Sequence, residues 1–344
     1  MHIFGQTPKP KNKKNMTRTI YAILTAFLFM SCSKDSVEPD TTSSEKMYFP
    51  PLTGTAWETK LIADLKWNQN AVQPLLDYLE LKHSKSFMIL VNGRIVLENY
   101  FNNHTATTNW YWASAGKTLT STATGIAQQE GLLNINNKVS QYLGTGWTSE
   151  TLAKENLIYK ADAGTRWAYH NVYVKLQDVV AKASGQTWQN YFNTRLRDKI
   201  GMDGTWIQLA VNSVYASTTR SMARFGLLML NKGKWENNVI LNETFFNEAT
   251  NTSQNINLGY GYLWWLNGKA NYHLPQSQLT FQGSVIPTGP NDMFMALGKN
   301  DQKIYVVPSK NMVVIRMGDA ADNVNLALSD FDKTLWEKIN ALYQ

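Results

Sequence analysis

The chain has a single cysteine, Cys32, among its 344 residues. One thiol cannot form an internal disulfide, so a small scaffold held together by disulfides is excluded. The fold must therefore depend on its apolar core. With 43% hydrophobic residues, including 12 Trp, 16 Tyr and 13 Phe, the composition is globular and fits one large domain or two lobes.

Acidic residues are absent from the first 31 positions, which hold five of the 33 Lys and Arg residues. The formal net charge of +7 is thus concentrated at the N-terminus, because the remaining residues carry 28 basic and 26 acidic side chains. A net charge of +2 on the rest of the chain leaves no basic surface that would bind nucleic acid. We expect no nucleic-acid partner.

An uncharged apolar run extends from Ile20 to Met30 behind Arg18. It is too short to span a bilayer comfortably and is typical of the hydrophobic part of a signal peptide. We predict a signal peptide over residues 1–31, with translation starting at Met1 or Met16. An uncleaved signal anchor is the alternative.

Cys32 follows this run directly, and the segment LFMSC resembles a bacterial lipobox, in which the cysteine is lipidated and becomes the mature N-terminus. The polar residues after it read as a flexible tether, so we assign 32–48 to the lipidated cysteine and tether. This predicts an exported protein, anchored at the periplasmic or the cell-surface face of the envelope. Its only contact with the membrane would be the lipid on Cys32.

Secondary-structure signals at the start of the folded part predict a hairpin followed by a helix. The apolar runs Phe87–Leu90 and Arg94–Phe101 are separated by Asn92-Gly93, a strong signal for a type I′ turn. From Ser114 onward the apolar spacing becomes helical, and Gly131 ends the pattern.

The rest of the chain predicts helices first and strands afterwards. Residues 132–250 contain helical patterns, among them Leu176–Ser184 and Ser221–Leu230, and no strand run of comparable quality. Three β-prone runs and an amphipathic closing helix follow: Met293–Leu297, Ile304–Val307, Met312–Met317 and about Leu326 to Leu342. We predict an α/β (α+β) fold over 49–344, an antiparallel sheet built from both chain ends with an inserted, mostly helical lobe.

The segment YWASAGKTLTSTATG, residues 111–125, can be read in two ways. Gly116-Lys117-Thr118 matches the end of a phosphate-binding loop, but that motif needs a first glycine where this chain has Tyr111. The other interpretation is a nucleophilic Ser114 with Lys117 one helical turn behind it. A lysine kept neutral by burial could take the serine proton.

The pattern S-x-x-K is common by chance, and it also occurs at Ser31–Lys34 and Ser43–Lys46. A second proton-handling group is therefore needed, and Tyr-x-Asn occurs at three places: Tyr100–Asn102, Tyr169–Asn171 and Tyr191–Asn193. The first lies at the end of the hairpin and the third in a helical run. Tyr169 follows a loop that turns into a helix, where a phenol can be presented toward a cleft.

These motifs, taken in order, resemble the serine β-lactamase and penicillin-recognising hydrolase superfamily, in particular its class C β-lactamase-like branch of esterases, D-amino-acid peptidases and 6-aminohexanoate-oligomer hydrolases. The resemblance covers most of residues 85–343. It rests on the following segments: SAGK at 114–117, GIAQQEGLLNINNKVSQYL at 125–143, GTRWAYHN at 164–171, LRDKIGMDGTWI at 196–207, SMARFGLLMLNKGKW at 221–235, GYGYLWW at 259–265 and ALGKNDQKIYVVPSKNMVVIRMG at 296–318.

The resemblance implies a role for each matching residue. Ser114 would be the nucleophile, Lys117 and Tyr169 the proton-transfer pair, and Asn171 a contact to the substrate amide. The expected activity is that of a serine hydrolase that cleaves an ester or amide bond through an acyl-enzyme. No cofactor or metal is implied, and the partner would be a small-molecule or peptide-like ester or amide substrate.

The third motif departs from the pattern. Where related β-lactamases have Lys-Thr-Gly, this chain has Ala296-Leu297-Gly298, with Lys299 following. Gly298 would let the strand approach the substrate, and the Lys299 amide would pair with that of Ser114 as an oxyanion hole. Ala296 and Leu297 cannot bind a carboxylate, which favours a less charged ester or amide substrate.

Two other functions stay open at this point. A D-Ala-D-Ala-type carboxypeptidase or β-lactamase would use the same serine, and a catalytically inactive binding module could keep the fold without turnover. We expect Arg316, in the last predicted strand, to be structural, as an ion pair or a charge at a sheet edge.

Overall fold

The computed structural model describes residues 45–144, 164–209, 211–322 and 330–343. Cys32 and the predicted signal peptide lie outside these ranges. Over the described ranges, none of the helices combines the length and the apolar character needed to cross a bilayer.

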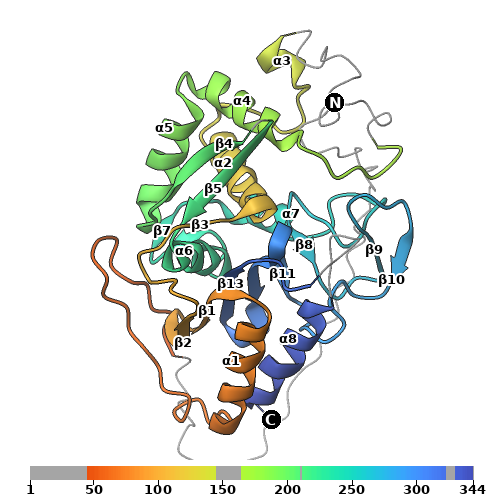
Figure 1. Ribbon diagram of the computed structural model, residues 1–344. Helices are drawn as coiled ribbons and strands as arrows, with labels where there is room; N and C mark the ends of the chain where they lie inside the picture. Colours follow the sequence, from red (N-terminus) through yellow and green to blue (C-terminus); the bar gives the residue numbers. More distant parts are fainter. Residues whose placement is uncertain (1–44, 145–163, 210, 323–329, 344) are drawn as a thin grey trace, which may run out of the picture.

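A six-stranded antiparallel sheet forms the centre of the molecule, in the order β2-β1-β13-β12-β11-β8 (Figure 1). Strands from the two ends of the chain are adjacent in it, because β1 pairs with β13. The prediction of an antiparallel sheet assembled from both ends of the chain is confirmed. The edge strand β8 was not predicted. The strands are β1 Ser84–Val91, β2 Arg94–Tyr100, β8 Trp265–Leu266, β11 Phe294–Gly298, β12 Gln302–Val307 and β13 Met312–Gly318.

The hairpin between β1 and β2 turns at Asn92-Gly93, as predicted. Both residues have a positive φ, 49° at Asn92 and 80° at Gly93, which a type I′ turn requires. A Cβ on Gly93 would lie 1.9 Å from the carbonyl oxygen of Tyr48. Glycine is thus needed both for the turn and for the packing of the preceding segment against it.

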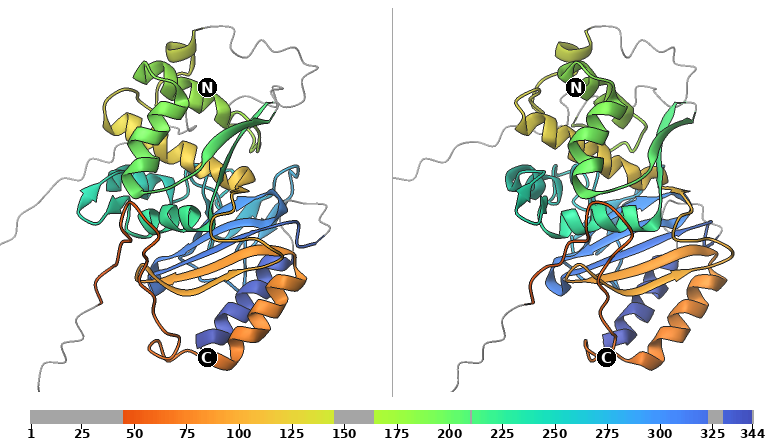
Figure 2. Two further views of the ribbon diagram at one scale, coloured as in Figure 1. Left: turned by 60° about the vertical axis from the view of Figure 1, so that its left-hand side comes forward. Right: turned by 90° about the vertical axis from the view of Figure 1, so that its left-hand side faces the viewer.

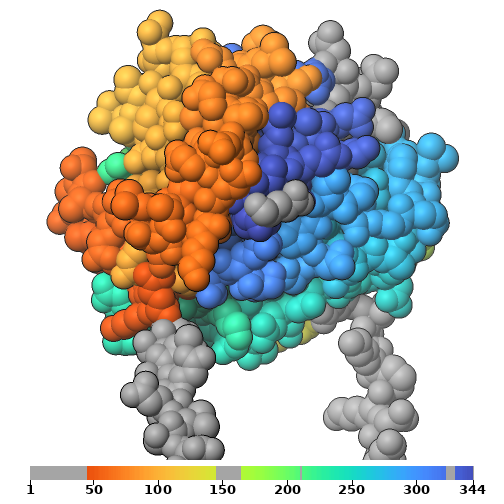
Figure 3. Space-filling view, turned by 90° about the horizontal axis from the view of Figure 1, so that it is seen from below, coloured from red at the N-terminus to blue at the C-terminus, as the bar shows by residue number. Residues whose placement is uncertain are grey.

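Helices cover both faces of the sheet (Figure 2). On one face lie α1 (Val72–Leu81) and α8 (Phe331–Asn340), whose side-by-side packing is visible in Figure 3. The rings of Tyr78 and Phe331 stack there at 5.7 Å between centroids. On the other face lies α6 (Thr219–Leu230), between the sheet and the helical lobe. The expected closing helix is confirmed over α8, and the four residues 326–329 of the expected range lie outside the described residues.

The inserted lobe is helical, as predicted, but it also contains strands that the sequence did not predict. A three-stranded sheet, β3-β5-β4, lies beside its helices. The sequence of β4, TWIQL, does not alternate strictly between apolar and polar residues, which is the pattern that marks a strand. Its large apolar side chains are exposed or half-buried. The lobe contains α2 Lys117–Gln129, α3 Ser140–Leu143, α4 Tyr173–Ser184, α5 Trp188–Phe192, α7 Glu243–Ala249, β3 Trp110–Tyr111, β4 Thr205–Leu209 and β5 Asn212–Ser217.

Short elements complete the described chain. Two two-stranded sheets are formed by β6 Lys234–Trp235 with β7 Asn238–Val239, and by β9 Asn271–His273 with β10 Thr280–Gln282. A π-helical turn, η4, covers Asn193–Arg197. The 3₁₀ turns are η1 Gln69–Ala71, η2 Ala113–Gly116, η5 Asp198–Ile200, η6 Lys299–Asp301, η7 Pro308–Lys310 and η8 Ala341–Tyr343.

The contact between α6 and the sheet has no room for an added side chain at Gly226. A Cβ there would lie 2.5 Å from Val313 Cγ1 and 3.3 Å from Ile304 Cγ2. Overpacking of a core costs about 1–3 kcal/mol, and Val313 has a stiff branched side chain. Alanine favours a helix over glycine by only about 1 kcal/mol. We expect Gly226→Ala to lower the free energy of unfolding by about 1 kcal/mol in urea titrations.

The double variant Gly226→Ala/Val313→Ala gives the control, because it removes the methyl groups that the new Cβ would meet. Its loss of stability should be smaller than the sum of the two single losses. Additive losses would show that the helix does not pack this closely on β13.

Candidate active site

Ser114 lies on the 3₁₀ turn η2, between β3 and the long helix α2. The helix predicted from Ser114 is confirmed, with its regular α-helical part beginning at Lys117. Ala113, just before the serine, has a φ of 48°, a conformation that residues with a Cβ rarely adopt and that is frequent at functional sites. Trp112 fixes the turn, since its amide donates to Tyr215 O at 2.8 Å and its indole to Ser217 Oγ at 2.8 Å.

Lys117 lies at the start of α2 with only 4% of its surface exposed. Its Nζ is 3.6 Å from the centroid of the Tyr169 ring and 5.1 Å from that of Tyr173. Burial lowers the pKa of the Lys117 amine to about 7, because removal from water disfavours the ammonium form. A substantial fraction of the amine is therefore neutral at neutral pH and can accept a proton.

Tyr169 reaches the same place from the segment that precedes α4. Burial raises the pKa of its phenol to about 12, and a side-chain hydrogen bond with Ser114 opposes this rise. The ring of Tyr169 stacks on Trp265 with 6.0 Å between centroids and contacts Trp167 and Tyr260 at 5.8 and 6.1 Å. The structure thus brings Tyr169 next to Lys117 and Ser114, which lie more than 50 residues earlier in the chain.

The remaining predicted residues lie in the turn after Tyr169 and at the end of strand β11. Asn171 is half-buried in the turn before α4, and its carbonyl accepts from the Val174 amide at 3.1 Å. Gly298 is the last residue of β11, and Lys299 begins the turn η6 with an exposed side chain. Ala296 and Leu297 are both buried, so their side chains belong to the core.

Gly298 brings the end of β11 directly against the segment that carries the serine. A Cβ at this position would lie 2.4 Å from Trp112 O and 3.1 Å from Ala115 N. Its φ of −122° is ordinary, so the requirement for glycine comes from close approach and not from backbone strain. The same approach brings Lys299, which follows in the chain, next to the turn of Ser114.

Some supporting residues were not assigned by the sequence. Tyr260 and Trp265, in the segment GYGYLWW, had no assigned role, and the structure places both against Tyr169. Tyr111 accepts a hydrogen bond at its Oη from Asn300 Nδ2 at 2.7 Å. No local pattern reveals that contact, because its partners are 189 residues apart. Among the described residues, no three His, Cys, Asp or Glu side chains gather where they could hold a metal ion.

This arrangement, with a serine at the start of a buried helix, a lysine one turn later and a tyrosine between lobe and sheet, defines the class of serine hydrolases with a β-lactamase-like fold. A family model described as Beta-lactamase matches residues 82–327. The chain belongs to the β-lactamase family.

Solved structures agree on the fold. A putative 6-aminohexanoate-dimer hydrolase from Bacillus anthracis has a TM-score of 0.64 at 17% identity, covering 85% of this chain and 89% of that one. A family VIII carboxylesterase reaches 0.59 at 13% identity, with 79% and 97% covered. A class C β-lactamase mutant reaches 0.56 at 16% identity, with 81% and 96% covered. The three neighbours are described as an amide hydrolase, an esterase and a β-lactamase. At these identities the similarity shows a shared fold and nothing more.

The buried amine predicts a pH-dependent stability. Between the folded pKa of about 7 and the unfolded value near 10.4, the unfolded chain binds the additional proton, so stability rises with pH. We expect Lys117→Met to be more stable than the wild type at pH 6–7. This advantage should shrink by up to about 1.4 kcal/mol per pH unit between pH 7 and 10.

Urea unfolding of both proteins from pH 6 to 10 measures this difference. The methionine variant supplies the baseline, because all other titrating groups are common to the two proteins. A difference that stays constant over the whole range would mean that the Lys117 amine is protonated in the folded protein.

Proposed function

We propose that this protein is a serine hydrolase that cleaves an ester or amide bond through an acyl-enzyme on Ser114. One observation carries the proposal: the hydroxyl of Ser114, the buried amine of Lys117 and the phenol of Tyr169 meet at one place. Lys117 is almost fully buried, and Ser114 directly follows Ala113, whose φ is positive.

The two proton-handling groups would have different tasks. With its pKa raised to about 12, the Tyr169 phenol is ionised in only about one molecule in 10⁵ at pH 7, so it is a poor base by itself. The Lys117 amine, with a pKa of about 7, is suited to accept a proton. Lys117 and Tyr169 would together remove the proton of Ser114: the amine, one helical turn after the serine, is the acceptor, and the phenol holds the serine through their side-chain hydrogen bond.

The reaction then follows the usual two steps of covalent catalysis. The Ser114 oxygen attacks the substrate carbonyl, and the amides of Ser114 and Lys299 hold the negative charge on the carbonyl oxygen. The bond to the leaving group breaks, and the leaving group takes the proton. Water, activated by Tyr169 together with Lys117, then attacks the acyl-enzyme, and Ser114 takes a proton back as the acid is released. Asn171 would contact the substrate amide.

The third motif bears on the choice of substrate. The side chains of Ala296 and Leu297 are buried and apolar, and that of Lys299 is exposed at the start of a turn. The two positions before Gly298 therefore supply no polar group that could bind a carboxylate. This supports an ester or amide of low charge as the substrate, in preference to a β-lactam or a peptide carboxylate.

We expect Ser114→Ala to abolish labelling by a fluorophosphonate, which forms a covalent bond to an activated serine oxygen and releases fluoride. Lys117→Ala and Tyr169→Phe should lower the rate of labelling by several orders of magnitude, because removal of one member of such a unit costs nearly as much as removal of all. Intact-protein mass spectrometry of residues 33–344 measures the adduct.

Ser121→Ala is the matched control, because Ser121 is fully buried on the same helix and its Oγ has no hydrogen-bond partner among the described residues. It should label like the wild type. A wild-type protein that takes up no fluorophosphonate would instead support the inactive binding module. A stable adduct with benzylpenicillin would move the substrate to β-lactams.

We also propose that the domain is exported and held at the membrane by a lipid on Cys32. The support comes from the sequence, in which an apolar run with an N-terminal arginine leads directly into the only cysteine. In a bacterial host fed with labelled palmitate, the full chain should become labelled and sediment with membranes. Cys32→Ser should lose both properties, and unchanged labelling of this variant would refute lipidation at this position.

A further inference from the structure

The turn after β11, residues 298–301, has an unusual backbone. Asn300 has φ 59° and ψ 34°, and Asp301 also has a φ of 59°. Two successive non-glycine residues in the left-handed region are costly, and such strain persists only where the surroundings hold it. The groups that hold this turn therefore decide where the Lys299 amide lies.

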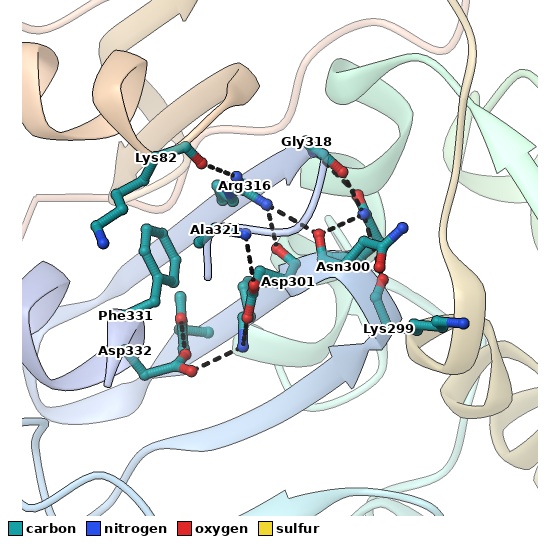
Figure 4. A network of polar contacts seen from close by, with 12 residues as sticks. Lys82, Lys299, Asn300, Asp301, Arg316, Gly318, Ala321, Phe331 and Asp332 are labelled. Carbon is teal, nitrogen blue, oxygen red and sulfur yellow. Dashed lines mark hydrogen bonds and ion pairs between the residues drawn. The ribbon is translucent and has the colours of Figure 1, made fainter. Parts of the chain in front are cut away.

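Arg316 holds the turn from within the sheet (Figure 4). It lies on β13 with no exposed surface, and its Nη1 donates to the carbonyl oxygens of Asn300 and Asp301, each at 3.0 Å. The expected structural role is confirmed, but the expected sheet-edge position is wrong, since β13 lies between β1 and β12. The residue bonds mainly to backbone carbonyls.

The other donors of Arg316 are also occupied. Nε donates to Ser84 Oγ at 3.0 Å, and Nη2 donates to the carbonyl oxygens of Lys82 and Asp319 at 2.6 and 3.0 Å. A guanidinium has five N–H groups, and five acceptors surround this one. Arg316 therefore has no donor left for a substrate, and any effect on the reaction must act through the groups it holds.

A second side chain supports the same carbonyl. Gln302, fully buried on β12, donates from Nε2 to Asn300 O at 2.8 Å and to Gly318 O at 2.6 Å. A Cβ on Gly318 would lie 2.5 Å from Arg316 Cζ, so glycine here makes room for the guanidinium. The Asn300 carbonyl thus accepts from two fixed donors on the neighbouring strands.

The opposite side of the turn is tied to the segment of the serine. Asn300 Nδ2 donates to Tyr111 Oη at 2.7 Å, and Tyr111 stands three residues before Ser114. Gly298 rests against Trp112 O and Ala115 N. The turn is therefore held between Arg316 on the sheet side and Tyr111 on the serine side, with the Lys299 amide in between.

We propose that Arg316 and Tyr111 are positioning residues that set the Lys299 amide against Ser114 and thereby form the oxyanion hole. This inference rests on the proposed function. A lysine cannot replace the arginine, because an ammonium has three donors at a single point and cannot reach five acceptors spread around a planar fork. Arg316→Lys would take this donor from the Asp301 carbonyl and leave the Asn300 carbonyl with Gln302 alone, so that the strained turn can relax.

The test measures the second-order rate at which a fluorophosphonate labels Ser114, since the negative charge developing on the phosphoryl oxygen needs the same amides as a substrate oxyanion. We expect Arg316→Lys to slow labelling by about 10- to 100-fold, as for a displaced donor. Tyr111→Phe, which removes only the tether to Asn300, should slow it several-fold. The pH midpoint of labelling should stay as in the wild type, because Lys117 and Tyr169 are untouched.

Arg224→Lys is the matched control. Arg224 is also a buried arginine that donates to backbone carbonyls, those of Ile200 at 3.0 Å and Pro51 at 2.7 Å, away from the 298–301 turn. It should label within twofold of the wild type under conditions where all variants are folded, as checked by circular dichroism.

The outcomes are distinguishable. If the wild type is labelled at Ser114 but Tyr111→Phe, or a folded Arg316→Lys, labels within twofold of it, the inference is overturned and the proposed function stands. A shifted pH midpoint would also overturn it, since the change would then act on the proton-transfer pair. If Arg316→Lys does not fold, Tyr111→Phe decides. A wild type without any label refutes both the proposed function and the inference.

Discussion

The close backbone approach at Gly298 is the contact on which the rest of the site depends. Here the end of a sheet strand meets the turn of the candidate nucleophile with no side chain between them. The serine belongs to the helical lobe and the neighbouring amide to the sheet, so neither part could form the site alone. A larger residue at this position would push the end of β11 away from the turn that carries Ser114, and the Lys299 amide would move away from the serine with it.

The burial of α2 is the second constraint. The helix is buried from Lys117 through Ala127, and its four threonine hydroxyls find partners inside the protein, whereas that of Ser121 has none among the described residues. Thr118 donates to Ala115 O at 2.7 Å, and Thr120 Oγ1 accepts from Gln177 Nε2 at 3.0 Å. Small polar residues let neighbouring helices pack closely while their hydroxyls stay satisfied. The same dense packing removes water from the lysine amine and so shifts its proton affinity, which links the core of the lobe to the chemistry proposed for its end.

How far the sequence predicts this structure depends on how local each signal is. The Asn92-Gly93 turn, the helix after Ser114 and the strands near the C-terminus follow from patterns within a few residues, and all were predicted. The strand β4 was missed because its pairing with β5, not its own pattern, makes it a strand. The structural role expected for Arg316 is confirmed, but the sheet edge, one of the two settings considered for it, is wrong, because strand order depends on the whole chain. The tether between Tyr111 and Asn300 joins residues 189 positions apart, and no single-sequence pattern contains it.

The order of strands in the sheet has a consequence for how the molecule is made. Val91 pairs with Met312, so the central strands can join only after a loop of more than 200 residues has closed. Such distant contacts slow folding, because the entropy of closing the loop is lost before the contact compensates for it. A ribosome releases the serine and its helix early, but β11 and the strands behind its turn come last. A partly synthesised or C-terminally truncated chain can therefore contain Ser114, Lys117 and Tyr169 and still lack a formed site. On the proposed mechanism, the serine would become reactive only when synthesis is nearly complete.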